Sequence, residues 1–149
     1  LKDYDLNLDK MEILTNSMAS SPNPIAYAGY SNSRKTLIDS GISIYEHQGP
    51  ESLHGKSYVY DNKISAVGSF NFDARSSFIN SEVMVIIYSE DFADKLMDHI
   101  NSDLDNSLKL NDDLTYEVDE SLKPAKISFI KKLFIKILEK VVYFLDHLL

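Results

Sequence analysis

The stretch that decides the interpretation of this chain reads Leu53-His54-Gly55-Lys56-Ser57-Tyr58-Val59-Tyr60-Asp61, and Gly68-Ser69-Phe70-Asn71 follows it after six further residues. Six positions are specified in the order His-x-Lys, four residues, Asp, six residues, Gly-Ser-x-Asn. They supply an imidazole, an ammonium, a hydroxyl and a carboxamide, the groups that attack and hold a phosphodiester. A match at six spaced positions is far more specific than a lone glycine-rich match.

The spacing of these residues predicts a shared site. If His54 and Lys56 lie on a strand, they point to the same face because they are two positions apart. Imidazole attacks phosphorus or transfers a proton near neutral pH, and a fixed ammonium stabilises the non-bridging phosphate oxygens. Ser69 and Asn71 are also two positions apart and are expected to donate hydrogen bonds to the same oxygens. Gly68 before them lets the backbone approach closely.

Each part of the pattern has a simpler interpretation when it is taken alone. A single strand histidine such as His54 is more often structural, and Lys56 alone is most often a solvated surface charge. Gly-Ser-x-Asn is usually a turn, and Asp61-Asn62 is most simply the turn of a hairpin. The functional prediction therefore depends on all the spacings being met together.

The rest of the sequence predicts alternating strands and helices, which indicates an α/β or α+β sheet protein. Gly41 stands where a glycine ends a helix. Residues 83–88 form a continuous apolar run, which is typical of a strand covered on both faces. Strands are expected at residues 11–16, 42–46, 56–60, 63–67 and 83–88, with a short one in 114–118, and helices at 24–40 and 90–104.

Composition excludes some classes of function. The chain of 149 residues has no cysteine, so disulfides, thiolate chemistry and cysteine-based zinc sites are excluded. The net charge of −8 is uneven, with ten basic residues against 21 acidic ones before Ala125 and five against two from there on. Nucleic acid is not an expected partner, because a general nucleic-acid binder usually has a basic main domain.

The basic C-terminal segment predicts an amphipathic helix. Lysines interrupt its apolar stretch, so it is not a good membrane-spanning helix. A helix with a lysine-rich polar face suits the surface of an anionic membrane. The alternative is a helix packed on the sheet or on a missing part of the protein. The apolar positions at helical spacing are Ile127, Ile130, Phe134, Ile137, Val141 and Leu145, and the lysines are Lys126, Lys131, Lys132, Lys136 and Lys140.

The six-position pattern resembles the catalytic motif of the phospholipase D superfamily. This resemblance implies a mixed β-sheet flanked by helices on both faces, here with the C-terminal amphipathic helix added. It also implies a covalent phosphohistidine intermediate, with a second histidine from a paired motif protonating the leaving group. No metal or cofactor is implied, because the two lysines of the paired motifs supply the positive charge.

The resemblance also assigns roles to individual residues. His54 is expected to be the nucleophile or the acid/base, and Lys56, Ser69 and Asn71 to bind the substrate phosphate. Glu82 matches the downstream acidic residue that hydrogen-bonds the histidine and orients it, although taken alone it is most simply a strand-edge surface acid. Asp61 belongs to the catalytic signature and is expected to support the turn instead of touching substrate.

Longer stretches are similar to the bacterial cardiolipin synthase-like branch, whose members move a phosphatidyl group between phospholipids. They comprise residues 13–17, 28–46, 52–56 and 68–76. The branch implies a phosphatidyl transferase or phosphodiesterase of the phospholipase D type acting on phospholipids. It also implies a peripheral location at the bacterial cytoplasmic membrane, with an anionic membrane surface bound through the C-terminal helix.

Enzymes of this type carry two such motifs, whereas this chain has one. Of its four histidines only His54 lies in a His-x-Lys pattern. A complete site needs either a missing N-terminal half or a second copy across a twofold axis. The missing half is preferred, because the sequence starts with Leu, lacks a signal-peptide pattern and matches the later half of such enzymes.

Three segments are therefore expected. Residues 1–107 form a phospholipase D-like catalytic half-domain, residues 108–124 an acidic linker, and residues 125–149 the basic amphipathic helix. Two other functions remain open. One is a single-motif homodimeric phosphodiesterase or nuclease, which the acidic domain disfavours. The other is an inactive half-domain that binds membranes.

Overall fold

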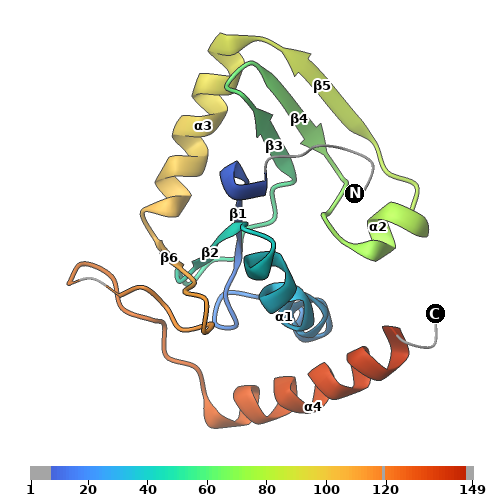
Figure 1. Cartoon of the computed structure of the whole chain (residues 1–149), viewed down its shortest axis with the longest axis vertical. Coiled ribbons are helices and arrows are strands. Elements are labelled where there is room, and N and C mark those ends of the chain that lie inside the picture. Colours follow the sequence, from blue (N-terminus) through green and yellow to red (C-terminus); the bar gives the residue numbers. More distant parts are fainter. Residues whose placement is uncertain (1–7, 119, 147–149) are drawn as a thin grey trace. The chain divides into compact units, whose positions relative to one another are not determined.

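The computed structural model describes residues 8–118 and 120–146. This part of the chain forms two compact units (Figure 1). The first unit takes the chain up to Leu53 and again from Asn106, and the second comprises His54–Asp105. Strands and helices occur in both units, so the mixed α/β class expected from the sequence is confirmed. The strands form two separate three-stranded sheets instead of one continuous sheet.

The first unit has a mixed sheet with strand order β1-β2-β6. β1 (Glu12–Asn16) and β2 (Ser43–His47) are parallel and are connected through α1 (Pro24–Asp39). β6 (Ser107–Lys109) pairs antiparallel with β2, and a short 3-10 helix, η1 (Leu8–Lys10), precedes β1. α1 covers the sheet, because its residues Tyr30, Leu37 and Ile38 pack against the buried cluster of Ile42, Ile44 and Leu110.

Local signals set both ends of α1. The Asn23 side chain accepts hydrogen bonds from the backbone N–H groups of Ile25 and Ala26, and Pro24 occupies the first helical turn. After the C-terminal end, Gly41 has a φ of 92°, a left-handed conformation that glycine adopts without a Cβ penalty. The predicted helix and its terminating glycine are therefore confirmed.

The start of the segment expected to be an acidic linker forms part of the first unit's sheet. Leu108 and Leu110 are buried, and the Leu110 N–H donates to the Ile44 carbonyl at 2.9 Å. Residues 108–110 thus complete the sheet and its core. The prediction of a strand at 114–118 is wrong, because this segment forms only an isolated bridge between Leu110 and Tyr116.

The strand β6 was not predicted at all. The two leucines of this stretch, Leu108 and Leu110, stand among polar residues, which is too short an apolar pattern to indicate a strand whose partner is distant in sequence.

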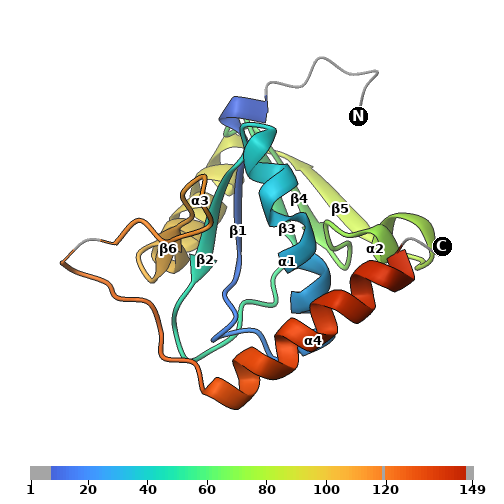
Figure 2. The same cartoon turned by 60° about the horizontal axis from the view of Figure 1, so that its bottom comes forward.

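The expected C-terminal helix is confirmed as α4 (Phe129–Asp146), and it packs against α1 (Figure 2). Ile135 is fully buried, and Glu139 accepts a hydrogen bond from Ser31 Oγ at 2.7 Å. Near the other end, Lys131 Nζ donates to the carbonyls of Ala19 and Ser21 at 3.1 and 3.2 Å. Among the helices in residues 8–118 and 120–146, none has the length and apolar character needed to cross a membrane.

The second unit is built on an antiparallel sheet with strand order β3-β4-β5. The predicted hairpin is present, with Asp61 and Asn62 at φ values of 50° and 52° between its two strands. Asp and Asn tolerate this left-handed conformation better than most residues. The elements are β3 (Ser57–Tyr60), β4 (Ile64–Gly68), α2 (Ala74–Phe78), β5 (Met84–Tyr88) and α3 (Glu90–Leu104), and α3 lies against β3 and β4.

One expectation for the second unit is wrong. The apolar run at residues 83–88 was expected to be covered on both faces, yet Val85, Ile86 and Tyr88 are exposed. Among the described residues β5 pairs with β4 and with no other strand, so it is an edge strand of a small antiparallel sheet. A run of apolar residues therefore does not by itself show that both faces of a strand are covered.

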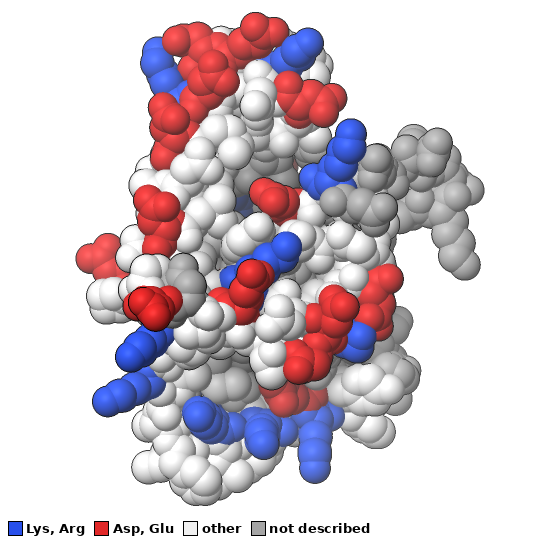
Figure 3. All heavy atoms as spheres, turned by 60° about the vertical axis from the view of Figure 1, so that its left-hand side comes forward, with Lys and Arg blue, Asp and Glu red and all other residues white. Residues whose placement is uncertain are grey.

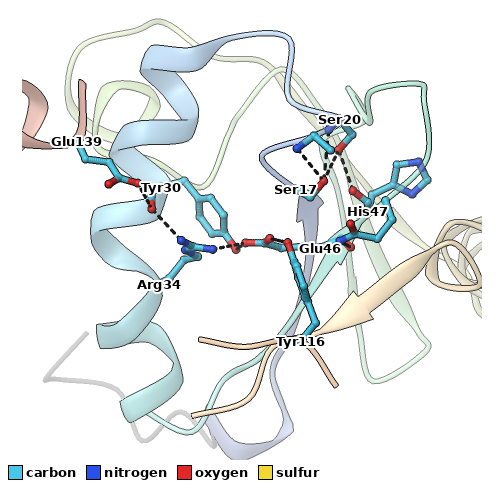
Figure 4. Close-up of polar contacts among 11 residues, drawn as sticks. Ser17, Ser20, Tyr30, Arg34, Glu46, His47, Tyr116 and Glu139 are labelled. Atoms are coloured by element: carbon cyan, nitrogen blue, oxygen red, sulfur yellow. Dashed lines mark hydrogen bonds and ion pairs between the residues drawn. The ribbon is translucent and has the colours of Figure 1, made fainter. Parts of the chain in front are cut away.

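A buried carboxylate organises the first unit. Glu46 on β2 is fully buried and accepts hydrogen bonds from Tyr30 Oη at 2.9 Å, Arg34 Nη1 at 3.1 Å and Tyr116 Oη (Figure 4). Burial, together with the Glu46 charge, raises the pKa of both tyrosines, so both phenols stay protonated as donors. Arg34 also donates to Ser31 Oγ at 2.9 Å. Glu46 therefore ties the sheet to α1 and to the segment around Tyr116.

A second polar contact fixes Leu53, the last residue of the first unit before the chain enters the second unit. The side chain of Asn16, the last residue of β1, accepts from the Leu53 N–H at 2.9 Å and donates to the Leu53 carbonyl at 2.8 Å. Both backbone groups of Leu53 are thus satisfied by one amide. Leu53 directly precedes His54, so Asn16 fixes the backbone at the point where the chain leads into the His-x-Lys motif.

Replacing Glu46 with Gln should lower the free energy of unfolding by about 3 kcal/mol, because the largely buried Arg34 side chain then lacks a counter-charge. Urea unfolding followed by circular dichroism measures this. The matched control is Asp39→Asn, which removes the carboxylate of the exposed Lys35–Asp39 ion pair and should cost less than about 1 kcal/mol. Equal effects of the two variants would show that the fold does not depend on the buried charge.

Replacing Asn16 with Ala should speed hydrogen exchange of the Leu53 amide by about fivefold, since its acceptor is lost at a net cost near 1 kcal/mol. Exchange measured by NMR at residue level tests this. Asn16→Asp keeps the acceptor and should preserve most of the protection. Asn32→Ala removes a side-chain hydrogen bond elsewhere on the first unit and is the control. Unchanged exchange in Asn16→Ala would contradict the assigned contact.

Candidate functional site

His54 and Lys56 meet in the structure, although neither lies within a strand. β3 begins at Ser57, so the two residues stand just before it. Lys56 Nζ lies 3.1 Å from His54 Nδ1 and 3.3 Å from Nε2, and it donates to the His54 carbonyl at 2.8 Å. The ammonium is therefore next to the imidazole. An anionic group bound at the ring would also contact a fixed positive charge.

The backbone of Lys56 is fixed by the sheet. Its carbonyl accepts from the Gly68 N–H at 3.1 Å, which extends the β3–β4 pairing by one more hydrogen bond. Gly68 is the last residue of β4 and stands immediately before Ser69. The two halves of the motif, separated by the hairpin, are thus joined at its open end.

Gly68 is required by sterics. A Cβ at this position would lie 2.0 Å from the Val83 carbonyl oxygen and 2.6 Å from Met84 Sδ. The backbone oxygen cannot give way without moving the chain, so a side chain does not fit. The close approach expected for Gly68 is therefore present, and it is made to the segment that opens β5.

Ser69 and Glu82 form a hydrogen-bonded pair. Ser69 Oγ donates to Glu82 Oε2 and accepts from the Val83 N–H at 3.0 Å. Asn80 Nδ2 donates to the other carboxylate oxygen at 3.1 Å. The hydrogen bond from Ser69, followed by that from Asn80, lowers the pKa of Glu82, and the Lys56 charge adds to the effect. The carboxylate is therefore ionised at neutral pH.

Asn71 lies in the loop that leads into α2. Its backbone N–H donates to Ser76 Oγ at 3.3 Å, and its carbonyl accepts from the Asp73 N–H at 2.8 Å. Asp73 caps α2 by accepting from the Ser76 N–H at 2.7 Å. In the part of the chain that the structure describes, the exposed Asn71 side chain makes no hydrogen bond, so its amide is free to bind a ligand.

The structure therefore brings the predicted site residues together in two pairs, His54 with Lys56 and Ser69 with Glu82. Within residues 8–118 and 120–146, Glu82 hydrogen-bonds Ser69 and Asn80 and makes no hydrogen bond to His54. Asp61 lies in the β3–β4 turn, as expected of a residue that supports the turn. The catalytic roles of all these residues stay predictions.

Two hydrogen-bonding residues, one in each unit, were missed by sequence reasoning. Asn80 orients Glu82, and its position two residues before the acid was the available signal, since short polar side chains often bond their own loop. Asn16 holds Leu53, and its place at the end of a predicted strand gave no hint of a partner 37 residues away. Across the described residues, no group of three or more His, Asp or Glu side chains is arranged to hold a metal ion.

Comparisons with known proteins show which family the chain is similar to. Cardiolipin synthase C of Escherichia coli (strain K12) is 36% identical over 101 residues, which cover 56% of this chain and 21% of that protein. Cardiolipin synthase 1 of Staphylococcus epidermidis (strain ATCC 12228) is 38% identical over 106 residues, or 71% of this chain and 20% of that protein. The chain thus spans about a fifth of the length of these curated relatives.

A solved structure is also similar, the phospholipase D family member Nuc from Salmonella typhimurium. It matches with a TM-score of 0.49 and 22% identity, covering 67% of this chain and 63% of that one. The family model described as "Cardiolipin synthase, PLD-like domain" matches residues 7–104, which include every residue of the candidate site. The chain therefore belongs to the phospholipase D-like domain family of the cardiolipin synthases.

Proposed function

We propose that this chain supplies one half of the active site of a phospholipase D-type phosphatidyltransferase that acts on phospholipids. The contact of the Lys56 ammonium with both ring nitrogens of His54, in a chain of this family, is the observation that carries the proposal. The cardiolipin synthases among its relatives favour phospholipids as the substrate class.

The proposed reaction has two steps. A ring nitrogen of His54, or of its counterpart in the other half, attacks phosphorus, and the bond to the leaving alcohol oxygen breaks. The leaving oxygen takes a proton from the histidine of the paired motif. A hydroxyl of a second lipid, such as the glycerol end of phosphatidylglycerol, then gives up its proton to that histidine and attacks the phosphohistidine. The phosphorus–nitrogen bond breaks, and a new phosphodiester is formed.

Lys56, Ser69 and Asn71 are proposed to bind the non-bridging oxygens. The Ser69 hydroxyl donates to Glu82, so it would have to turn toward the phosphate when substrate binds. That exchange would release one oxygen of the ionised Glu82, which is then able to accept from His54 and fix its tautomer. Because Ser69 and Glu82 bond each other in the structure, both proposed roles require this exchange of partners.

The site is proposed to need a second His-x-Lys motif. A missing N-terminal half of the same protein is the preferred source, and a second copy of the chain is the alternative. We also propose a peripheral location at the bacterial cytoplasmic membrane, where phospholipid substrate is present. The C-terminal helix, α4, is the proposed contact with the anionic surface.

Replacing His54 with Ala in the complete gene product should reduce conversion of labelled phosphatidylglycerol to transfer product by at least about 100-fold, because the group that forms or protonates the reacting bonds is lost. His99→Ala is the matched control, since His99 is exposed on α3 outside the motif, and it should leave turnover unchanged. Undiminished turnover in His54→Ala would remove the proposed role. Label retained on His54 after an alkaline quench would identify it as the nucleophile.

Expressed without the other half, this chain should sediment as a monomer and show no turnover, because it has one of two required histidines. Turnover should appear when a half that carries the second motif is supplied. Analytical ultracentrifugation and the phosphatidylglycerol assay measure these two properties. An active dimer of the chain would instead favour the homodimeric enzyme. Lipid binding with no turnover in the complete protein would favour an inactive membrane-binding half.

A further inference from the structure

α4 has a different character on each of three sides. Because an α-helix makes one turn in 3.6 residues, positions three or four apart share a side. The side packed on α1 includes Ile135 and Glu139. A second side is apolar and exposed, and a third side carries lysines. A helix that only packed on its own domain would be expected to have one apolar side.

The packed side fixes the rotation of α4 about its own axis. Glu139 accepts from Ser31 Oγ through its carboxylate and from Asn32 Nδ2 through its backbone carbonyl at 3.1 Å. Lys131 is held by two backbone carbonyls two turns earlier. The contacts of Lys131 and Glu139 lie one turn before and one turn after the buried Ile135. The helix therefore cannot rotate its exposed apolar side toward α1 without breaking these hydrogen bonds.

The second side is a large exposed apolar surface. Ile130 is 79% exposed and Phe144 is 64% exposed, although both stand at apolar positions of the helix. An apolar strip of this extent on a surface helix marks an interaction site. It is formed by Ile130, Leu133, Phe134, Ile137, Val141 and Phe144.

Lysines border the apolar surface along one edge. Lys132, Lys136 and Lys140 are exposed and follow at i, i+4 and i+8, so they form a row along one side of the helix. Figure 3 shows basic side chains gathered over α4 at the lower end of that view, next to uncharged atoms. Phe129 and Leu133 follow at the same spacing on the apolar side of this row.

We propose that the exposed apolar side of α4 inserts into the headgroup region of an anionic bilayer while its opposite side stays docked on α1. The lysine row would then lie at the level of the lipid phosphates, where ammonium groups complement anionic headgroups. An apolar side bordered by lysines, on a helix too polar to span, is the pattern of a helix that lies in the membrane interface.

The charges favour a lipid surface over a second copy of the apolar strip. Two copies facing each other across a twofold axis would bring their lysine rows to the edges of one interface, and Glu139, the one acid among the described side chains of α4, is bonded to α1 and does not face them. A bilayer with anionic lipids satisfies both the apolar side and the lysine row. The choice of lipid as occupant rests in part on the proposed function, whereas binding itself requires no catalysis.

Co-sedimentation with vesicles of phosphatidylglycerol and phosphatidylcholine tests the proposal on the purified chain. Changing Lys132, Lys136 and Lys140 together to Gln should weaken binding by about 100-fold. The control changes Lys35, Lys63 and Lys95 to Gln, which alters net charge equally on exposed lysines outside α4, and should have little effect. Equal loss in both triple variants would overturn the proposal, because it would show an effect of net charge alone.

Tryptophan fluorescence tests whether the apolar side of α4 inserts into the bilayer. The chain has no tryptophan, so Phe134→Trp gives a single reporter. Its emission should shift to the blue with anionic vesicles and be quenched by brominated acyl chains. Ile86→Trp, on the exposed β5, should show neither change.

Two outcomes would overturn the assignment of lipid as the occupant. One is an unshifted tryptophan emission from the Phe134→Trp variant in the presence of bound vesicles. The other is self-association of the chain that is lost in a variant with Ile130, Phe134 and Ile137 changed to Ser, which would identify a second copy as the partner. Loss of phosphatidyl transfer in His54→Ala with vesicle binding intact would concern the proposed chemistry only, so the two failures are distinguishable.

Discussion

The charge of one carboxylate buried in the sheet constrains the whole first unit. Glu46 is fully buried, and three side chains on two segments, α1 and the segment around Tyr116, supply the donors that an ionised carboxylate requires. Arg34, one of those donors, also donates a hydrogen bond to Ser31 Oγ, and Ser31 Oγ donates to Glu139 on α4 (Figure 4). The C-terminal helix therefore belongs to the same hydrogen-bond network. The positions of α1 and α4 are thus linked to the need to satisfy a single buried charge.

Predictions from the sequence succeeded where signals were local. The ends of α1 follow from Pro24 and Gly41, and the β3–β4 hairpin follows from its Asp-Asn turn. β6 was not predicted, because three residues become a strand only through a partner about 60 positions earlier. The exposure of β5 was missed for a related reason, since an apolar run does not specify its covering.

In the candidate site, too, features that depend on local spacing were predicted and features that depend on distant neighbours were not. His54 and Lys56 were expected to share a face of a strand; they lie just before β3 and are in contact there, so they are close together for a different local reason. The spacing after Gly68 placed Ser69 and Asn71 beyond the same hairpin. The partner of Glu82 was not predictable, because the direction of a side chain at the end of a loop depends on neighbours such as Asn80 and Val83. The steric role of Gly68 is likewise visible only when the opposing backbone is seen.

The docking of α4 on α1 has a consequence for the order of folding. Ser31 and Glu139 are 108 residues apart, so their contact closes a long loop and is expected to form late in folding. During synthesis α1 is complete long before α4 leaves the ribosome. In that interval the side of α1 on which α4 packs is not yet covered by α4. A newly made chain therefore passes through a stage at which chaperones have access to a helix surface that the finished molecule conceals.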